Sequence, residues 1–598
     1  MKKNIILLPL FAACFALADD EVYDGQNINN MDFSNAKLNY SSWRNTGIGK
    51  SNNFTGTSLK EADFTGATIS VEKFANANLK DSIFDKSICY GAKFDGANLT
   101  NASFLSATLI YSHSQSSYNF ATSFVDANLT NAKLSGLTFS TTYNSVNFKN
   151  ANLRNADLSD GIFTTGEIYS RSYLFDGADL TGTNFTNATF ADISIEENSN
   201  RYYNRSSAVS LQNTIINKTN FTGAILCAGA SSVDFSNMSL IEANFTNAIL
   251  SAKSWSGTSS CSVSFSNAKL INCIFTGAIL GATGGADTGV DFSGMDMANV
   301  SFAGATFNSH VKLKDCNIQC ADFSAAVNLT TSHLSATKSY ADKNLYGVKF
   351  GNLDLSNWIL RGQNLQNTSF AGANLTGVNA RYADLRGSDL TGITGSLKTQ
   401  NTIWTDGEIK NFSMESVDDS LTIRAYVPAT SGGEMINAKI SEDATISGGA
   451  VLTLEEGAIL EIMAGKTLTV ADNSEIIFNV DVASNNTKIL LNSGSTIAFG
   501  EDSKVTINLD GVISPDDSYT FSAIEAATDA CISGADAISK DNLVLNVNGE
   551  AYDSDKWGFN FDPTTGALTI NVNVPEPATV TAIFGAVALA FAVYRRRR

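Results

Sequence analysis

The chain has 598 residues, of which 43% are hydrophobic and 17% charged, a composition typical of a folded protein and not of a disordered one. Its 59 acidic residues outnumber 40 basic ones, so the formal net charge is −19. Such acidity argues against direct binding to nucleic acid or to anionic lipid.

The chain offers little for catalysis or metal binding. Its three histidines are His113, His310 and His333, and none has a cysteine or second histidine at metal-ligand spacing. No phosphate-binding glycine loop is present. We therefore expect no enzyme activity, no catalytic residue, no metal and no cofactor, although a carboxylate pair for sugar cleavage can form across neighbouring turns of a repeat without a sequence signature.

The N-terminus has the pattern of a secretory signal peptide. Lys2 and Lys3 precede an apolar run over residues 5–17. The small-residue cleavage site consists of Ala16, Ala18 and Asp19. We predict that signal peptidase removes residues 1–18, and that residues 19–32 form a linker.

The next feature is a five-residue period of large apolar residues. It begins with Phe54, Leu59, Phe64, Ile69, Phe74, Leu79, Phe84, Cys89, Phe94, Leu99, Phe104 and Leu109. Neither a helix nor a flat strand has this period. Alanine often stands two positions before the apolar centre, and alternation then places both side chains inside. The remaining positions are small, polar and turn-prone, so the chain bends after each short extended piece and coils.

Individual units resemble the pentapeptide-repeat family. Residues 127–131 and 373–377 both read Ala-Asn-Leu followed by two small residues, which is the unit of that family. The resemblance runs over residues 33–393 and implies an all-β fold, a right-handed four-sided β-helix.

From Phe124 onward the centres come in groups of four, separated by loops of varying length. The first two groups are Phe124, Leu129, Leu134 and Phe139, then Phe148, Leu153, Leu158 and Phe163. If an insertion follows every fourth unit, one turn contains four units and all insertions leave from the same corner.

These insertions are rich in Tyr, Ser, Asn, Arg and Trp, which are common in adaptable recognition surfaces. The candidate recognition residues are Tyr111, Tyr118, Tyr143, Tyr169, Tyr173, Tyr202, Tyr203 and Trp255. Stacked along one corner, they suit a glycan or a protein partner. The alternative is that they are tolerated surface loops without a target.

Eight cysteines are present, and seven remain after signal cleavage, so at least one thiol has no partner within the chain. Cys14 also suggests an alternative lipoprotein site, although its apolar region is short. Cys89, Cys273 and Cys316 fall on inward repeat positions and are expected to be buried thiols. The remaining alternative is a disulfide between two cysteines in successive loops, Cys227 and Cys261.

Residues 394–573 lack the five-residue period but remain β-rich. Runs such as residues 450–454, 458–462 and 475–478 are separated by Gly-Ala, Gly-Lys and Asp-Asn turns. We expect a second, solenoid-like, stalk-like β region here, with a β-sandwich as the alternative.

The last residues, 574–598, form a three-part signal. The motif Val574, Pro575, Glu576 and Pro577 precedes an uncharged stretch and the basic tail Arg595, Arg596, Arg597 and Arg598. Residues 578–594 predict a single transmembrane helix with the arginines on the cytoplasmic side. This order resembles the PEP-CTERM family, which implies processing by an exosortase-type enzyme in a bacterium that makes extracellular polysaccharide.

Together these signals predict an exported, noncatalytic structural or adhesive protein. Its precursor is anchored in the inner membrane, and its mature form lies at the cell surface or in the extracellular matrix, with extracellular polysaccharide as a candidate partner. One alternative is a polysaccharide-binding or polysaccharide-processing β-solenoid. A second is an acidic DNA mimic, which the export signal disfavours.

Overall fold

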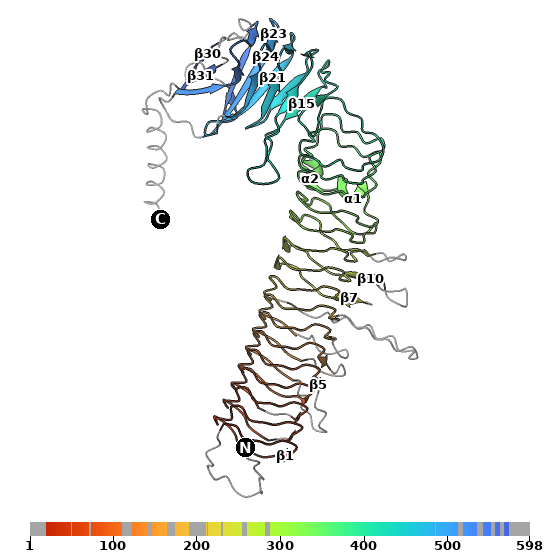
Figure 1. The fold of residues 1–598 in the computed structure, drawn as a ribbon, viewed down its shortest axis with the longest axis vertical. Coiled ribbons are helices and arrows are strands. Elements are labelled where there is room, and N and C mark those ends of the chain that lie inside the picture. Colours follow the sequence, from red (N-terminus) through yellow and green to blue (C-terminus); the bar gives the residue numbers. More distant parts are fainter. Residues whose placement is uncertain are drawn as a thin grey trace, which may run out of the picture. The chain divides into compact units, whose positions relative to one another are not determined.

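The computed structural model describes most of the chain between residues 19 and 572. The segments outside the description are residues 1–18, 50, 71–72, 111–121, 140–145, 164–173, 191–210, 212, 229–230, 254–259, 282–287, 485, 512–517, 535–541, 552–556, 563–566 and 573–598. The chain divides into two compact units (Figure 1). The first contains Met1–Asn344, Val348–Asp354 and Phe370–Ala373; the second contains Leu345–Gly347, Leu355–Ser369 and Asn374–Arg598.

The first unit is a stack of coils, each made of four five-residue units. Parallel bridges join Ser58 to Asn78 and Asn78 to Asn98, so residues one coil apart are 20 positions apart where no insertion intervenes. The prediction of four sides per turn is therefore confirmed.

Each corner of a coil depends on a residue with positive φ. Asn76, Gly96 and Asn101 have φ of 57°, 68° and 59°, a region that glycine enters freely and asparagine tolerates. Where the residue before a centre is Asn or Asp, its side chain can support the bend by accepting bonds from the residue after the centre. For example, Asn98 Oδ1 accepts from the Thr100 amide at 3.2 Å and from its hydroxyl at 2.7 Å.

The interior contains aromatic columns beside aliphatic columns such as that of Leu59, Leu79 and Leu99. Phe54 stacks on Phe74 with ring centroids 4.8 Å apart, and Phe74 stacks on Phe94 at 5.1 Å. Rings of adjacent columns meet edge-on, as Phe64 and Phe74 do at 6.0 Å. Offset stacks and edge contacts are the favourable arrangements of aromatic pairs. The inward positions predicted from the period are buried, including Cys89, Cys273 and Cys316.

One face of the first coils forms a six-stranded parallel sheet in the order β1-β2-β3-β4-β5-β6. Because β1 lies within residues 19–32 and Val22, Tyr23 and Ile28 are buried, these residues form part of the first coil and not the predicted linker. The strands are β1 (Asn27–Ile28), β2 (Gly47–Ile48), β3 (Thr68–Ser70), β4 (Ile88–Tyr90), β5 (Thr108–Ile110) and β6 (Thr138–Phe139). Further along, β9 (Ser239–Ile241) pairs in parallel with β12 (Lys269–Ile271).

Two short helices interrupt the coils, and the five-residue pattern did not predict them. They are α1 (Thr331–Ser335) and α2 (Lys338–Ala341). The Thr337 side chain caps α2 by accepting a bond from the Tyr340 amide. The helices of the described chain are far too short to cross a bilayer. The predicted span at residues 578–594 lies outside the described residues.

In the second unit the coils change from four sides to three. After the hairpin β13 (Thr402–Ile403) and β14 (Ile409–Lys410), three parallel sheets run in the orders β15-β18-β21-β24-β28, β16-β19-β22-β26 and β17-β20-β23-β27. Each coil contributes one strand to each sheet, so the second region is a solenoid as predicted, and the sandwich alternative is wrong. Alternate residues are buried, as in β18, so alternate side chains of such a strand point into the core and out to solvent.

The strands of this second solenoid have the following bounds: β15 (Ser420–Ile423), β16 (Ala438–Ile440), β17 (Ala444–Ile446), β18 (Val451–Leu454), β19 (Ile459–Ile462), β20 (Thr467–Val470), β21 (Glu475–Asp481), β22 (Lys488–Leu491), β23 (Thr496–Phe499), β24 (Lys504–Asp510), β26 (Ile524–Ala526), β27 (Cys531–Ser533), β28 (Leu543–Val547) and β29 (Glu550–Ala551). The region ends in an antiparallel sheet of β25 (Ser518–Ser522), β31 (Ala567–Val572) and β30 (Trp557–Phe561).

Candidate functional site

Most residues that the sequence singled out lie outside the described part of the chain. They are Ala16, Ala18, Tyr111, Tyr118, Tyr143, Tyr169, Tyr173, Tyr202, Tyr203, Trp255, Val574, Pro575, Glu576, Pro577 and Arg595–Arg598. Of the predicted site residues only Asp19 is described. It is exposed, and its Oδ1 accepts a bond from the Asn39 amide at 2.9 Å.

The described residues show where the predicted recognition loops attach. Parallel bridges stack Ile225, Ile249 and Ile279 in consecutive coils. Each of these isoleucines precedes the last centre of its coil, and an insertion begins shortly after that centre. In two coils the insertion starts as an antiparallel hairpin, β7 (Cys227–Ala228) with β8 (Ser231–Ser232), and β10 (Ser251–Lys253) with β11 (Ser260–Ser262). These insertions therefore leave from one corner.

A disulfide joins the two corner hairpins. Cys227 in β7 and Cys261 in β11 are bonded, with Cα atoms 6.0 Å apart and a sequence separation of 34. This disulfide was one alternative in the sequence analysis. It forms because consecutive coils bring the two cysteines close together. A structural disulfide is typical of an exported protein in an oxidising compartment.

The remaining buried thiols are not suited to chemistry. Burial raises the pKa of each of Cys89, Cys273 and Cys316 to about 12. Because the thiolate is the reactive form, such cysteines are inert. Among the described residues no three His, Cys, Asp or Glu side chains gather as a metal site.

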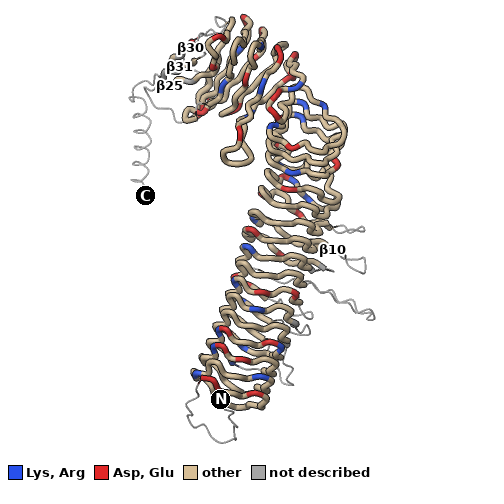
Figure 2. Tube along the Cα trace, viewed as in Figure 1, with Lys and Arg blue, Asp and Glu red and all other residues tan. Residues whose placement is uncertain are grey.

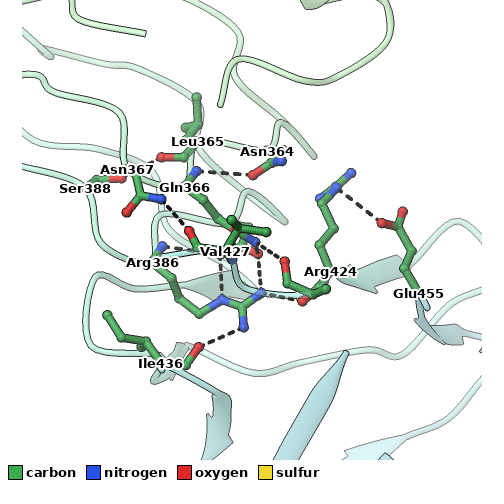
Figure 3. A network of polar contacts seen from close by, with 12 residues as sticks. Asn364, Leu365, Gln366, Asn367, Arg386, Ser388, Arg424, Val427, Ile436 and Glu455 are labelled. Atoms are coloured by element: carbon green, nitrogen blue, oxygen red, sulfur yellow. Dashed lines mark hydrogen bonds and ion pairs between the residues drawn. The ribbon is translucent and has the colours of Figure 1, made fainter. Parts of the chain in front are cut away.

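A polar network holds the segment that follows β15 against the last pentapeptide coils (Figure 3). Arg386 and Asp384 are both only 1% exposed and form a two-pronged ion pair, with Nη2 to Oδ2 at 2.6 Å and Nε to Oδ1 at 3.0 Å. Arg386 also donates to the carbonyls of Arg424 at 2.6 Å and Ile436 at 3.0 Å.

A second anchor of this segment comes from the preceding coil. Gln366 donates to Asp384 at 2.8 Å and to the Ala425 carbonyl at 3.0 Å, and Asn367 donates to the Val427 carbonyl at 2.7 Å. The segment has no strand partner for these carbonyls, and buried carbonyls need donors. The side chains at these outward repeat positions supply them, so the network is structural.

The second unit also contains an open pocket of about 430 Å³. Its lining residues are Arg381, Lys398, Thr399, Gln400, Asn411 and Ser413. All six residues are polar or charged, and their aliphatic carbons also supply part of the exposed lining.

Three neighbouring pieces of backbone build the pocket. Residues 379–381 pair with residues 398–400 of the next coil: Asn379 forms a parallel bridge with Lys398, the Ala380 amide bonds to the Lys398 carbonyl at 3.1 Å and the Tyr382 amide to the Gln400 carbonyl at 2.9 Å. The third wall follows β14. The buried Asn401 amide exchanges two bonds of 2.7 Å with the Ser413 backbone, and this reciprocal pair fixes that wall.

The pocket lies on a ladder of positive charge. The Gly362 amide bonds to the Arg381 carbonyl at 2.9 Å, which sets Arg361 beside Arg381 in consecutive coils. The Arg361 guanidinium lies 3.9 Å from the ring centroid of Tyr382, a cation–π contact. Within the described chain neither Arg381 nor Lys398 forms an ion pair. Figure 2 shows several Lys and Arg segments on these coils, although the chain as a whole is acidic.

The nearby carboxylates of Glu415 and Asp419 accept hydrogen bonds from other groups. Glu415 accepts a bond from the Ser413 hydroxyl at 3.0 Å. Asp419 accepts from the Tyr382 hydroxyl and from the amides of Glu415 and Ser416. Burial alone would raise the pKa of Asp419, but the bond from Tyr382 and those from the two amides outweigh it and lower the pKa. The two pocket cations are thus left to face solvent.

The repeat pattern alone did not predict this pocket, although the spacing of two arginines pointed to part of it. Arg361 and Arg381 each follow a repeat centre and are 20 residues apart, so the coil period stacks them. Lys398 and Asn411 belong to the region where the period ends, and their neighbours in space cannot be read from it.

Two family models match the chain. Pentapeptide repeats match in eight copies over residues 73–109, 122–164 and 360–392, and the PEP-CTERM protein-sorting motif matches residues 573–598. The chain therefore carries pentapeptide repeats and a C-terminal PEP-CTERM sorting motif, as the sequence predicted. The motif indicates an exported protein that an exosortase-type enzyme sorts. Folds of the pentapeptide-repeat kind are generally noncatalytic. No curated protein matches the chain.

Solved structures similar to the chain include two pentapeptide repeat proteins and a fluoroquinolone resistance protein. HetL from Nostoc sp. strain PCC 7120 is 14% identical, with 64% of this chain and 92% of HetL covered and a TM-score of 0.09. A thylakoid lumen protein of Arabidopsis thaliana is 23% identical, with coverages of 24% and 68% and a TM-score of 0.08. The fluoroquinolone resistance protein QnrB1 is 14% identical, with coverages of 52% and 92% and a TM-score of 0.11. These TM-scores are too low to carry an argument, so the fold rests on the strand pairing above.

Proposed function

We propose that this chain is a noncatalytic structural and adhesive protein of the cell surface or extracellular matrix. The observation that carries the proposal is the sorting motif at residues 573–598, which joins an export route to a body made mainly of stacked β-coils. A regular solenoid is suited to spacing and presenting surfaces, because each coil contacts only its neighbours and the stack can be long.

In this proposal the insertions form the adhesive surface. Their attachment at one corner supports a continuous strip, and the Cys227–Cys261 bond ties the hairpin that leads into the insertion containing Trp255 to the hairpin of the preceding coil. Aromatic side chains give a large contact area at low cost in conformational entropy. Replacing Tyr202, Tyr203 and Trp255 together by serine should reduce attachment of cells to a polysaccharide-coated surface, while the fold is retained.

The processing route is tested on the protein from its native host. Cell fractionation, intact-mass measurement and terminal peptide analysis should show loss of residues 1–18 and a new C-terminus near Pro577, with the mature chain in a surface or matrix fraction. The precursor should be found in the inner membrane, held by residues 578–594. An unprocessed chain in the cytoplasm would overturn the proposal and favour the DNA-mimic alternative.

A further inference from the structure

The polar pocket of the second unit has the chemistry of a binding site for a sugar acid. Arg381 and Lys398 supply positive charge, and Thr399, Gln400, Asn411 and Ser413 supply hydroxyl and amide groups. We propose that this pocket binds the carboxylate and neighbouring hydroxyls of an acidic saccharide, and that the ladder of Arg361, Arg381 and Lys398 extends the site to a polyanionic chain.

The charge of the site is the first argument. In a chain with a net charge of −19, two cations beside one pocket would be expected to have carboxylate partners. Within the described chain Arg381 and Lys398 have none, whereas Lys410 pairs with Glu408 and Arg386 with Asp384. A guanidinium that is not paired internally can bind a carboxylate through two parallel hydrogen bonds.

The lining of the pocket is the second argument. Phosphate or another simple anion needs only the two cations. A sugar acid also presents hydroxyl groups, and the remaining four lining side chains match those groups as donors and acceptors. A pocket of about 430 Å³ suits one or two sugar rings.

The spacing of the ladder is the third argument. Arg361, Arg381 and the stretch 398–400 occupy consecutive coils, and neighbouring strands lie about 4.8 Å apart. Arg361 and Arg381 are in register, and Lys398 lies two positions before Gln400, the residue in register with Arg381. Positive charge thus occurs on three consecutive coils, as carboxylates recur along a polyuronate. A trisaccharide should contact more than one cation, and a monosaccharide only the pocket.

The pocket lies apart from the proposed adhesive corner. Saccharide binding is measured on the purified full chain, so the result does not depend on where the protein is exported. Isothermal titration calorimetry with trigalacturonate should give saturable binding at least tenfold tighter than binding of galacturonate or inorganic phosphate, with no binding of neutral cellotriose. The affinity should fall when sodium chloride rises from 50 mM to 500 mM, because salt screens exposed charges.

Two variants and one control locate the site. Arg381→Gln and Lys398→Gln should each weaken trigalacturonate binding about tenfold or more. Lys133→Gln removes an exposed lysine that has no ion pair within the described chain, and it should leave binding unchanged. Thermal unfolding checks that all variants are folded. Equal binding of phosphate and trigalacturonate, absence of trigalacturonate binding, or equal losses in Lys133→Gln would each overturn the assignment.

Discussion

The four-sided and three-sided coils bury a continuous core by different means. In the pentapeptide region each side is one five-residue unit, the corners use positive-φ residues such as Asn101, and aromatic rings fill the interior. In the three-sided region the strands are longer, up to seven residues in β21, and aliphatic columns such as Leu452, Ile476 and Val505 fill the interior.

The two regions also differ in how regular their coils are. Pentapeptide coils without insertions repeat every 20 residues, whereas the first residues of β15, β18, β21 and β24 pair at separations of 31, 24 and 29 residues. A fixed corner chemistry makes the coil length constant, while long strands with variable loops do not. The constant coil length of the pentapeptide region therefore comes from its turns and not from its core.

The largest expected effect follows from placing a charge in an aromatic column. Phe245 stacks between Phe221 at 5.1 Å and Phe275 at 4.9 Å and is fully buried. Phe245→Asp should destabilise the first unit by more than about 4 kcal/mol, because the carboxylate is desolvated without a partner. Guanidinium denaturation followed by circular dichroism measures this loss.

The matched control places the same charge one residue earlier. Asn244 faces outward, and its Oδ1 accepts bonds from the amide and hydroxyl of Thr246, which an aspartate can also accept. Asn244→Asp should change stability by less than about 0.5 kcal/mol. Similar losses in both variants would contradict the inside–outside assignment of the repeat. Ile476→Asp applies the same test to the three-sided coils.

The second largest effect should come from the buried ion pair where the two kinds of coil meet within the second unit. Arg386→Met leaves Asp384 buried without its partner and should cost about 3–5 kcal/mol in unfolding free energy. The double variant Asp384→Leu with Arg386→Met should recover part of the loss. Chemical denaturation of the second unit, resolved by hydrogen exchange, measures both.

An exposed pair provides the comparison. Arg44 pairs with Asp63, but the arginine side chain is 61% exposed, so Arg44→Ala should lower the unfolding free energy far less than Arg386→Met does. If Arg386→Met cost no more than Arg44→Ala, the segment after β15 would not depend on the network.

The disulfide should have an intermediate effect that is confined to the four-sided coils. Cys227→Ala should lower the unfolding free energy by about 2–4 kcal/mol, because the bond limits the unfolded chain. The exposed, unpaired Cys531 lies in the three-sided region, and Cys531→Ala should have almost no effect. Reducing agent should lower the melting temperature of the native chain and leave that of Cys227→Ala unchanged; an equal shift in both would contradict the prediction.

The smallest effect concerns acid. Burial alone would raise the pKa of Asp291, but bonds from Ser293 and Lys312 outweigh it and lower the pKa. A carboxyl whose pKa is lower in the folded state stabilises the fold above its unfolded pKa of about 3.9, and this contribution is lost as the pH falls through the folded pKa. Asp291→Asn should therefore lose less stability than the native chain between pH 5 and pH 3.

The size of this effect is below about 1 kcal/mol, because the side chain is half exposed and solvent screens it. Melting temperatures of both proteins at pH 7, 5 and 3 measure it. A steeper acid loss in Asp291→Asn than in the native chain would show that the sign is wrong.

Much of the first unit was predictable because its rules are local. A residue's place in the five-residue unit decides whether it faces inward, so Phe245 and Cys273 could be placed inside without tertiary information. Helices α1 and α2 were not predictable from the period, because they form where it lapses. The sequence predicted that the second region is a solenoid. It did not predict which strands pair in which register, because the lengths of these coils vary.

The repeat, its inward columns, the four units per coil and the sorting motif follow from the amino-acid sequence, because each depends only on the order of residues along the chain. The tertiary structure alone decided the rest. Asp384 and Arg386 stand at outward positions, and they are buried only because a segment some 40 to 50 residues away covers them. The basic pocket likewise exists because consecutive coils bring Arg381 and Lys398 to one place and the chain after β14 brings Asn411 back to Thr399, contacts that depend on distance in space and not along the chain.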